Sequence, residues 1–193
     1  ASSEHDAEVE VFEAKALQLM ARHEIEEREL RDAGPIEEQV IDLTSFGNAG
    51  KGAGALVHWL APLFGAQALL WSTGDGKSGR VKVFATPSQF EALSTLVDHL
   101  TPQLRADIIR DRPRSRKSFS MAWASRVSKR YQEAIAEAYA GESALVPTTT
   151  EADRFMTEQE FRVTRTKSRI NPADYARGER RGNEARLGQT EVR

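Results

Sequence analysis

The sequence contains no cysteine, and it has no long apolar run. Without cysteine among its 193 residues, the chain cannot form disulfide bonds, carry out thiol catalysis or build a Cys-based zinc site. No apolar run approaches the ~20 residues that a membrane-spanning helix needs, and no signal peptide is visible. The four histidines, at positions 5, 23, 58 and 99, lack the spacing of metal ligands. We therefore expect no metal, no cofactor, no membrane contact and a cytoplasmic location.

The chain also lacks a convincing catalytic or nucleotide-binding motif. The Gly-rich stretch 47–54 has no Lys-Ser/Thr pair after its last glycine, so it departs from a phosphate-binding P-loop and is expected to be a mobile loop. GDGKS at 74–78 would need glycine at position 71, which is Trp71. The pair His23-Glu24 begins a zinc-protease pattern, but Glu27 stands where the second histidine belongs. We expect a protein that is not an enzyme, although residues brought together in space could still form a hydrolase site.

The charges are strongly segregated along the chain. The net charge is only −2, yet residues 1–42 hold four basic and thirteen acidic residues. Residues 105–130 hold nine basic and two acidic residues, and residues 162–193 hold nine and four. Such asymmetry favours charge-steered association with a partner. The alternatives are that acidic and basic parts face each other, within one chain or across a dimer, or that the charges are simply solvated.

Hydrophobic spacing predicts a long amphipathic helix at 118–140. Its apolar residues lie four apart, at Phe119, Trp123, Val127, Tyr131 and Ile135, which places them on one helical face. A second helix is predicted at 87–110, with Pro87 at its first position and Pro102 interrupting it or kinking it. Gly141 would end the first of these helices.

The other patterns complete a mostly helical α+β fold with a small antiparallel sheet. Strands are predicted at 36–43, 66–73 and 80–86, the last two forming a hairpin around a Gly-rich loop. Helices are predicted at 3–22, 23–30 and 55–65, and a short one after the threonines at 148–150. We expect the sheet to be covered on one face by the helices 87–110 and 118–140. The predicted units are an N-terminal helical hairpin (1–34), an α+β core (35–145) and a basic C-terminal helical extension (146–193).

The extension contains a clear helix start. In Asn171-Pro172-Ala173-Asp174 the asparagine is a cap, the proline a first helical residue and the aspartate a first-turn acid. Gly178 and Gly182 lie four apart on one face of that helix. Small residues there would let it dock closely on another backbone; the alternative is a frayed terminal helix.

The stretch 14–30, AKALQLMARHEIEEREL, resembles the domain-of-unknown-function family numbered 2786, found in actinobacteria and their phages. The matching residues are Ala14, Lys15, Ala16, Gln18, Leu19, Met20, Arg22 and His23. Ser118-Phe119, Arg126 and the Tyr175…Gly178…Gly182 pattern resemble a companion region of the same proteins. The family pattern usually starts earlier, so residues are expected before Ala1. The resemblance implies no catalytic residues, because the family has no settled activity.

Some temperate actinophage proteins of this layout are similar to recombination directionality factors of large serine integrases. The resemblance implies a regulatory protein that binds an integrase on DNA and promotes excision. The alternative is direct nucleic-acid binding through residues 105–130 and 162–181. The predicted partner-binding residues are Arg126, Lys129, Arg130, Arg162, Arg165, Lys167, Arg169, Tyr175, Arg177, Arg180 and Arg181.

Overall fold

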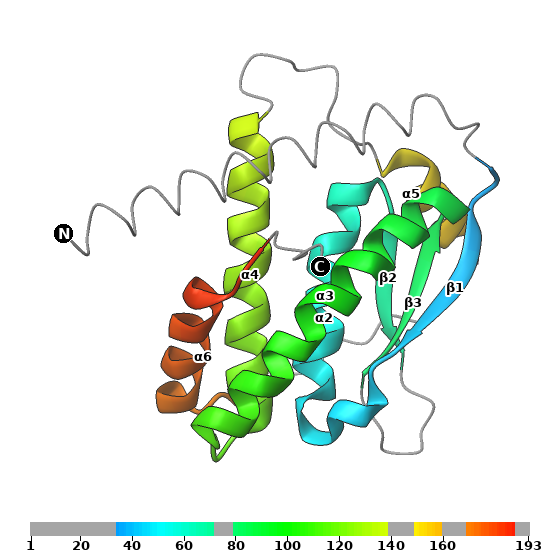
Figure 1. Ribbon diagram of the computed structural model, residues 1–193. Coiled ribbons are helices and arrows are strands. Elements are labelled where there is room, and N and C mark those ends of the chain that lie inside the picture. Colours follow the sequence, from blue (N-terminus) through cyan, green and yellow to red (C-terminus); the bar gives the residue numbers. More distant parts are fainter. Residues whose placement is uncertain (1–33, 72–78, 139–148, 160–168, 188–193) are drawn as a thin grey trace, which may run out of the picture.

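The computed structural model describes residues 34–71, 79–138, 149–159 and 169–187. These residues form a mostly helical α+β fold with a small antiparallel sheet, which confirms the predicted class (Figure 1). In chain order the elements are β1 (Glu37–Asp42), η1 (Thr44–Ala49), α2 (Gly50–Leu60), η2 (Ala61–Phe64), β2 (Gln67–Trp71), β3 (Arg80–Ala85), α3 (Pro87–Asp111), α4 (Arg116–Ala138), α5 (Thr150–Glu158) and α6 (Pro172–Glu184). The predicted N-terminal helical hairpin, 1–34, lies outside the described residues except for Gly34.

The sheet confirms the predicted hairpin and adds β1 to it. The strand order is β1-β3-β2, and both pairings are antiparallel. Val83 of the central strand lies opposite Gln39 of β1 and Ala68 of β2. Val81 and Val83 are fully buried while Lys82 between them is partly exposed, as the period of two along a strand requires.

The helices lie in layers that differ from the predicted arrangement. We expected the helix at 118–140 to cover the sheet, and that is wrong: α2 and α3 pack on the sheet, and α4 packs on the far side of α2 (Figure 1). The predicted apolar face of α4 is buried from Phe119 to Tyr131, but it faces the other helices. The short helix α5 covers part of the opposite sheet face, where Phe155 contacts Phe84 at a ring-centroid distance of 6.0 Å.

The Gly-rich stretch 47–54 is not the expected mobile loop, because most of it belongs to η1 and the start of α2. The reason is close packing. A Cβ atom on Gly52 would lie 2.0 Å from Ser120 Oγ, and one on Gly54 would lie 3.2 Å from Val81. Glycine weakens an isolated helix, but here it lets α2 pass between α4 and the sheet.

Local signals place α3 as predicted. Thr86 and Gln89 form a reciprocal capping box at the start of the helix, with Pro87 as the first helical residue between them. The helix then continues through Pro102 as one element of 25 residues, so Pro102 does not begin a separate segment. At its end Arg112 adopts a left-handed conformation with φ 43° and stops the helix.

Helix α6 is docked tightly on α4, which is one of the two alternatives that its glycines left open; the other was a frayed terminal helix. Asn171 caps it by accepting a hydrogen bond from the Asp174 amide at 3.1 Å. A Cβ atom on Gly178 would lie 2.1 Å from the Phe119 carbonyl oxygen, and one on Gly182 would lie 2.9 Å from the Trp123 carbonyl oxygen. The two backbones therefore touch, and α6 is an integral part of the folded body.

Candidate anion-binding surface

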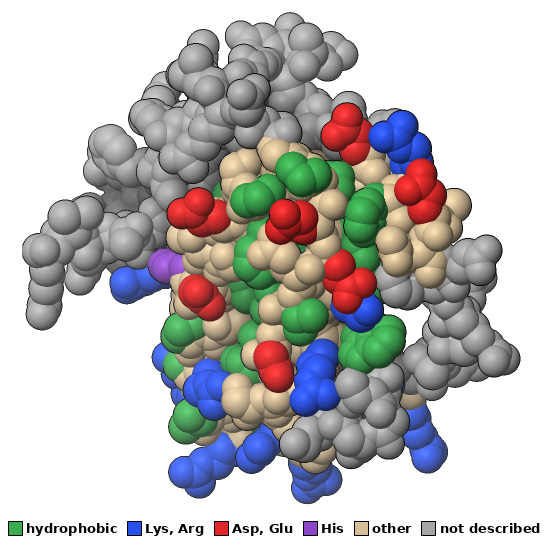
Figure 2. Space-filling model, turned by 90° about the vertical axis from the view of Figure 1, so that its right-hand side faces the viewer, with side chains coloured by type: hydrophobic (Ala, Val, Ile, Leu, Met, Phe, Trp, Pro, Cys, Tyr) green, Lys and Arg blue, Asp and Glu red, His purple; other side chains and the backbone are tan. Residues whose placement is uncertain are grey.

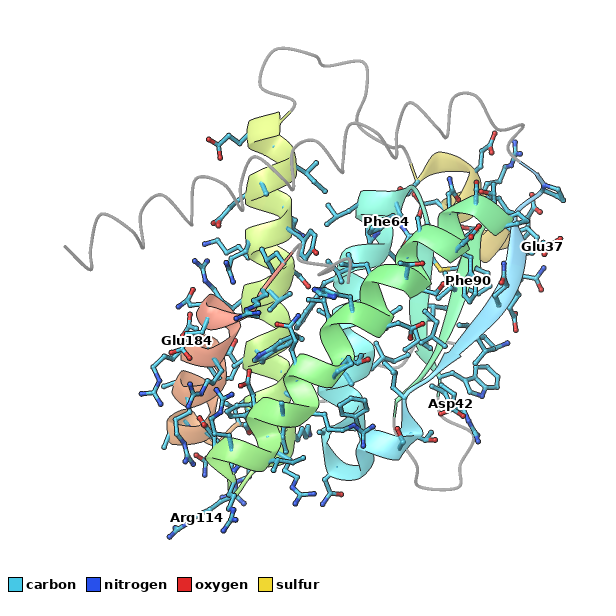
Figure 3. The ribbon with its side chains drawn as sticks, in the orientation of Figure 1. Glu37, Asp42, Phe64, Phe90, Arg114 and Glu184 are labelled. Atoms are coloured by element: carbon cyan, nitrogen blue, oxygen red, sulfur yellow. The ribbon has the colours of Figure 1, made fainter. Side chains whose placement is uncertain are left out.

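The turn between α3 and α4 gathers arginines at one end of the molecule. Only residues 112–115, Arg-Pro-Arg-Ser, separate the two helices. Pro113 is buried, and Ser115 Oγ accepts a hydrogen bond from the Ser118 amide at 3.2 Å, which caps the start of α4. The turn therefore has a defined conformation, and Arg114 projects from its tip (Figure 3).

Beside this turn lies an open groove of about 460 Å³. We call it the basic groove; its lining residues are Ser45, Phe46, Arg105, Ile108, Ile109, Arg112, Pro113 and Arg116. The Arg105 guanidinium lies 4.5 Å from the centre of the Phe46 ring and donates a hydrogen bond to Ser45 Oγ at 3.0 Å. Ile109 is 66% exposed, so the groove combines an apolar wall with cationic side chains.

Two arginines of the turn and the first residue of α4 have no described acidic partner. Arg112, Arg114 and Arg116 are exposed, and no carboxylate in the described ranges pairs with any of them. Figure 2 shows Lys and Arg side chains gathered at the same lower end of the molecule, with the acidic side chains of that face above them. The basic groove therefore carries uncompensated positive charge within the described part of the chain.

The two acids of the 105–130 segment are used inside the fold. Asp107 accepts a hydrogen bond from Trp123 Nε1 at 3.0 Å and pairs with Arg110 at 3.4 Å. Burial raises the pKa of Asp107, although the bond from Trp123 opposes that rise. Asp111 pairs with Arg181 at 2.8 Å. Neither carboxylate neutralises the turn arginines.

The acidic residues of β1 pair with the sheet and not with this turn. Glu38 contacts Lys82 Nζ at 2.6 Å, and Asp42 contacts Arg80 at 3.5 Å. One alternative for the charge pattern was that acidic and basic segments pair within the chain. Such pairs occur here for Glu38 and Asp42. They join β1 to β3.

Two of the predicted partner-binding residues on α4 hold α6 in place. Arg130 donates hydrogen bonds to the carbonyl oxygens of Gly182 at 3.0 Å and Ala185 at 2.7 Å, which satisfies groups that the end of α6 leaves open. Arg126 donates to the side chain of Asn183 and lies 3.8 Å from Glu133. The third residue, Lys129, is exposed and approaches only Glu133 among described acids, at 3.8 Å.

The predicted residues on α6 divide in the same way. Arg177 pairs with Asp174 and donates to the Asp111 carbonyl at 3.3 Å. Arg181 pairs with Asp111 and Glu184, and these carboxylates raise its pKa further. Tyr175 is half-buried, whereas Arg169 and Arg180 are exposed. The predicted residues Arg162, Arg165 and Lys167 lie outside the described residues.

The partner-binding residues predicted from the sequence that the structure describes therefore lie on or next to α4 and α6. They do not include Arg105, Arg112 or Arg116 of the basic groove. The signal was present, because the run RDRPRSRK at 110–117 is visible in the sequence and belongs to the stretch predicted to bind nucleic acid. Phe46 and Ser45 had no such signal. They reach the groove through η1, a segment that the sequence predicts in part to be a loop.

A second exposed surface lies on the sheet. Val40, Leu70 and Trp71 are 54%, 43% and 42% exposed. Lys82 lies over the Trp71 ring at 4.1 Å and links it to Glu38. Asp42, at the end of β1, lies well away from Arg114 (Figure 3). Val40 and Trp71 lie on the Lys82 side of the sheet, whereas Leu70 lies on the side that α2 covers. We call Val40 and Trp71 the sheet patch; it is separate from the basic groove.

The histidines in the described ranges have structural partners. His58 Nδ1 lies 2.6 Å from the Ala68 carbonyl oxygen, and His99 contacts Gln103. No group of three or more metal-ligating side chains gathers within residues 34–71, 79–138, 149–159 and 169–187. In the same ranges, no helix has the length and apolar character needed to cross a membrane.

Comparison of the whole chain with protein-family models, with curated proteins and with solved structures found no significant match.

Proposed function

We propose that this protein binds nucleic acid through the basic groove. The observation that carries the proposal is the set of exposed arginines, Arg112, Arg114 and Arg116, around a groove with no described carboxylate to neutralise them. Arginine suits phosphate recognition because its planar guanidinium donates two parallel hydrogen bonds to a phosphate.

The apolar wall supports the same function. Phe46 and Ile109 offer apolar surface beside the guanidinium groups, which suits sugar and base faces while phosphates meet the arginines. A purely ionic surface would need no such wall. Because the net charge of the whole chain is −2, attraction to phosphates has to come from a local concentration of positive charge, and the basic groove provides one.

The test is a fluorescence-anisotropy titration of a labelled single-stranded oligonucleotide and of its duplex, repeated over a salt series. Wild type is expected to bind with an affinity that falls as salt rises, because phosphate contacts release counterions. The double variant Arg114→Gln/Arg116→Gln is expected to reduce the magnitude of the slope of log K against log[salt] by about 1.4 for the single strand and about 1.8 for the duplex.

A matched control removes the same charge elsewhere. Lys129→Gln/Arg180→Gln changes two exposed cations on α4 and α6, both among the partner-binding residues that the sequence predicts. The proposal requires this control to bind like wild type. If the control loses affinity and the groove variant keeps it, the binding site lies on α4 and α6. If the affinity of wild type does not change with salt concentration, the nucleic-acid proposal is refuted.

A second candidate function is the regulation of a serine integrase as a recombination directionality factor, which rests on the sequence resemblance. The sheet patch favours it, because such a factor needs a surface for its protein partner in addition to any contact with DNA. Exposed apolar residues flanked by ion pairs are typical of protein contacts. The basic groove and the sheet patch would then serve two partners.

This second function is tested by pull-down and recombination assays with the cognate integrase. Trp71→Ala is expected to weaken integrase capture and the shift toward excision, while oligonucleotide affinity stays unchanged. If the wild-type protein changes neither direction of recombination, this second function is ruled out. The nucleic-acid proposal is not affected by that result.

A further inference from the structure

Side chains of helix α6 bind the turn 112–115 and the end of α3 that precedes it. Asp174 Oδ2 accepts a hydrogen bond from the Ser115 amide at 2.8 Å, within the turn itself. Arg177 donates to the Asp111 carbonyl at 3.3 Å, and Arg181 pairs with the Asp111 carboxylate at 2.8 Å. Three side chains of α6 thus hold both ends of the turn 112–115.

Asp174 is the central member of this set. It is 1% exposed, and its other carboxylate oxygen pairs with Arg177. Burial by itself raises the pKa of Asp174, but the backbone hydrogen bonds from Ser115 and Arg114 and the pairing with Arg177 outweigh it, so the net pKa is lowered. A buried charge with all of its partners in place is costly to disturb, because removing one partner leaves the others unpaired.

The turn needs such a restraint. Arg112 sits in a left-handed conformation that a non-glycine residue adopts at a cost, and Arg114 is exposed at the tip. Held in one conformation, the turn keeps Arg112 and Arg116 on the same groove. Without these contacts to α6, the residues of the turn would have to become ordered on binding, and this entropic cost lowers affinity.

We propose that Asp174 is a positioning residue of the basic groove: its bond to the Ser115 amide fixes the turn so that the arginines are arranged for phosphate before the ligand arrives. This inference rests on the proposed nucleic-acid function. It assigns to α6 a part in binding that does not require α6 to touch the ligand.

The test compares Asp174→Ala and Asp174→Asn with Tyr131→Phe. Tyr131 donates to the Leu187 carbonyl at the other end of the α6 segment, so its variant weakens the docking of that segment far from the turn. Each variant is measured for thermal unfolding and for affinity toward the labelled oligonucleotide used above. Asp174→Asn keeps an acceptor oxygen and provides a folded sample if Asp174→Ala does not fold.

We expect Asp174→Ala to bind about two- to tenfold more weakly than wild type, the cost of re-ordering a mobile side chain on binding. Asp174→Asn should fall between the two, and Tyr131→Phe should lose stability without losing affinity. Equal affinity loss in Asp174→Asn and Tyr131→Phe would overturn the inference, because the effect would then be general loosening of α6. Wild-type affinity in both Asp174 variants would overturn it as well.

A measurement without ligand separates this inference from the proposed function. Amide hydrogen exchange at Ser115 should be faster in Asp174→Asn than in wild type, while exchange in the middle of α4 stays unchanged. Unchanged exchange at Ser115 would refute the positioning role even if the oligonucleotide binds. Faster exchange combined with no wild-type binding would refute the nucleic-acid function alone.

Discussion

Replacing Gly178 by alanine tests whether α6 is docked backbone to backbone on α4. If α6 were a separate, solvated helix, Gly178→Ala would stabilise it by about 1 kcal/mol, because glycine is a poor helix former. In the structure the added Cβ would lie 2.1 Å from the Phe119 carbonyl oxygen and 3.0 Å from the Phe119 Cα. The two arrangements therefore predict effects of opposite sign.

The magnitude follows from what the new methyl group meets. The contacted atoms belong to the backbone of α4, which cannot rotate away as a side chain would, so α6 itself must move. Forcing an extra methyl group into a packed interface costs about 1–3 kcal/mol, occasionally more. A contact of 2.1 Å with backbone places the cost at the upper end of this range, about 2–3 kcal/mol. After the helix-propensity gain of about 1 kcal/mol is subtracted, we expect a net destabilisation of about 1–2 kcal/mol.

Urea unfolding monitored by circular dichroism measures this change in the free energy of unfolding. In a thermal melt of the same variant, the midpoint temperature should fall by about 2–4 °C per kcal/mol for a chain of this size. Gly182→Ala is the graded comparison, since its Cβ would lie 2.9 Å from the Trp123 carbonyl oxygen, and its loss should be smaller. A Gly178→Ala variant as stable as wild type, or more stable, would refute the docked arrangement.

Three further predictions concern named hydrogen bonds. Thr86→Ala removes the capping box of α3 and should lower the free energy of unfolding by about 1 kcal/mol, measured by urea unfolding. Asp174→Asn should flatten the acid side of the stability curve. The pKa of Asp174 is lowered in the fold, so its contribution is present above the unfolded pKa of about 3.9 and is lost as pH falls through the lower folded value. Trp123→Phe removes the indole bond to Asp107; the pKa of Asp107, already raised by burial, should rise further. Because a raised carboxyl pKa favours the protonated folded state, the variant should lose more stability than wild type as pH increases from the unfolded pKa through the folded one.

Each of these predictions has a contrary result. An unchanged urea midpoint for Thr86→Ala would show that the cap contributes nothing measurable. Parallel acid curves for wild type and Asp174→Asn would contradict the lowered pKa. A carbon-13 carboxyl titration in which the pKa of Asp107 stays fixed after Trp123→Phe would contradict the role given to the indole bond.

Local signals in the sequence predicted most of the elements. Pro87 and the Asn171-Pro172 pair mark helix starts that the structure confirms, since these residues suit the first turn of a helix whatever surrounds it. The spacing of the apolar residues in α4 gave its buried face correctly. It did not say what that face meets, and α2, not the sheet, covers it.

The errors arose where distant packing overrides local preference. The glycines at 47–54 suggested a loop, yet Gly52 lies against Ser120 of another helix. Arg130 resembled a solvent-facing cation, but it donates to carbonyl groups more than fifty positions along the chain. Such pairings depend on how α6 docks, and no periodicity in the sequence encodes that.

The most direct test of the nucleic-acid proposal is amide chemical-shift mapping of the isotope-labelled full chain during titration with the oligonucleotide. The account predicts that the largest shift changes fall on Ser45, Phe46, Arg105, Arg112 and Arg116, and that they decrease as salt is added. Largest changes at exposed positions of α4 and α6, such as Lys129 and Arg180, with the groove residues unmoved, would contradict it.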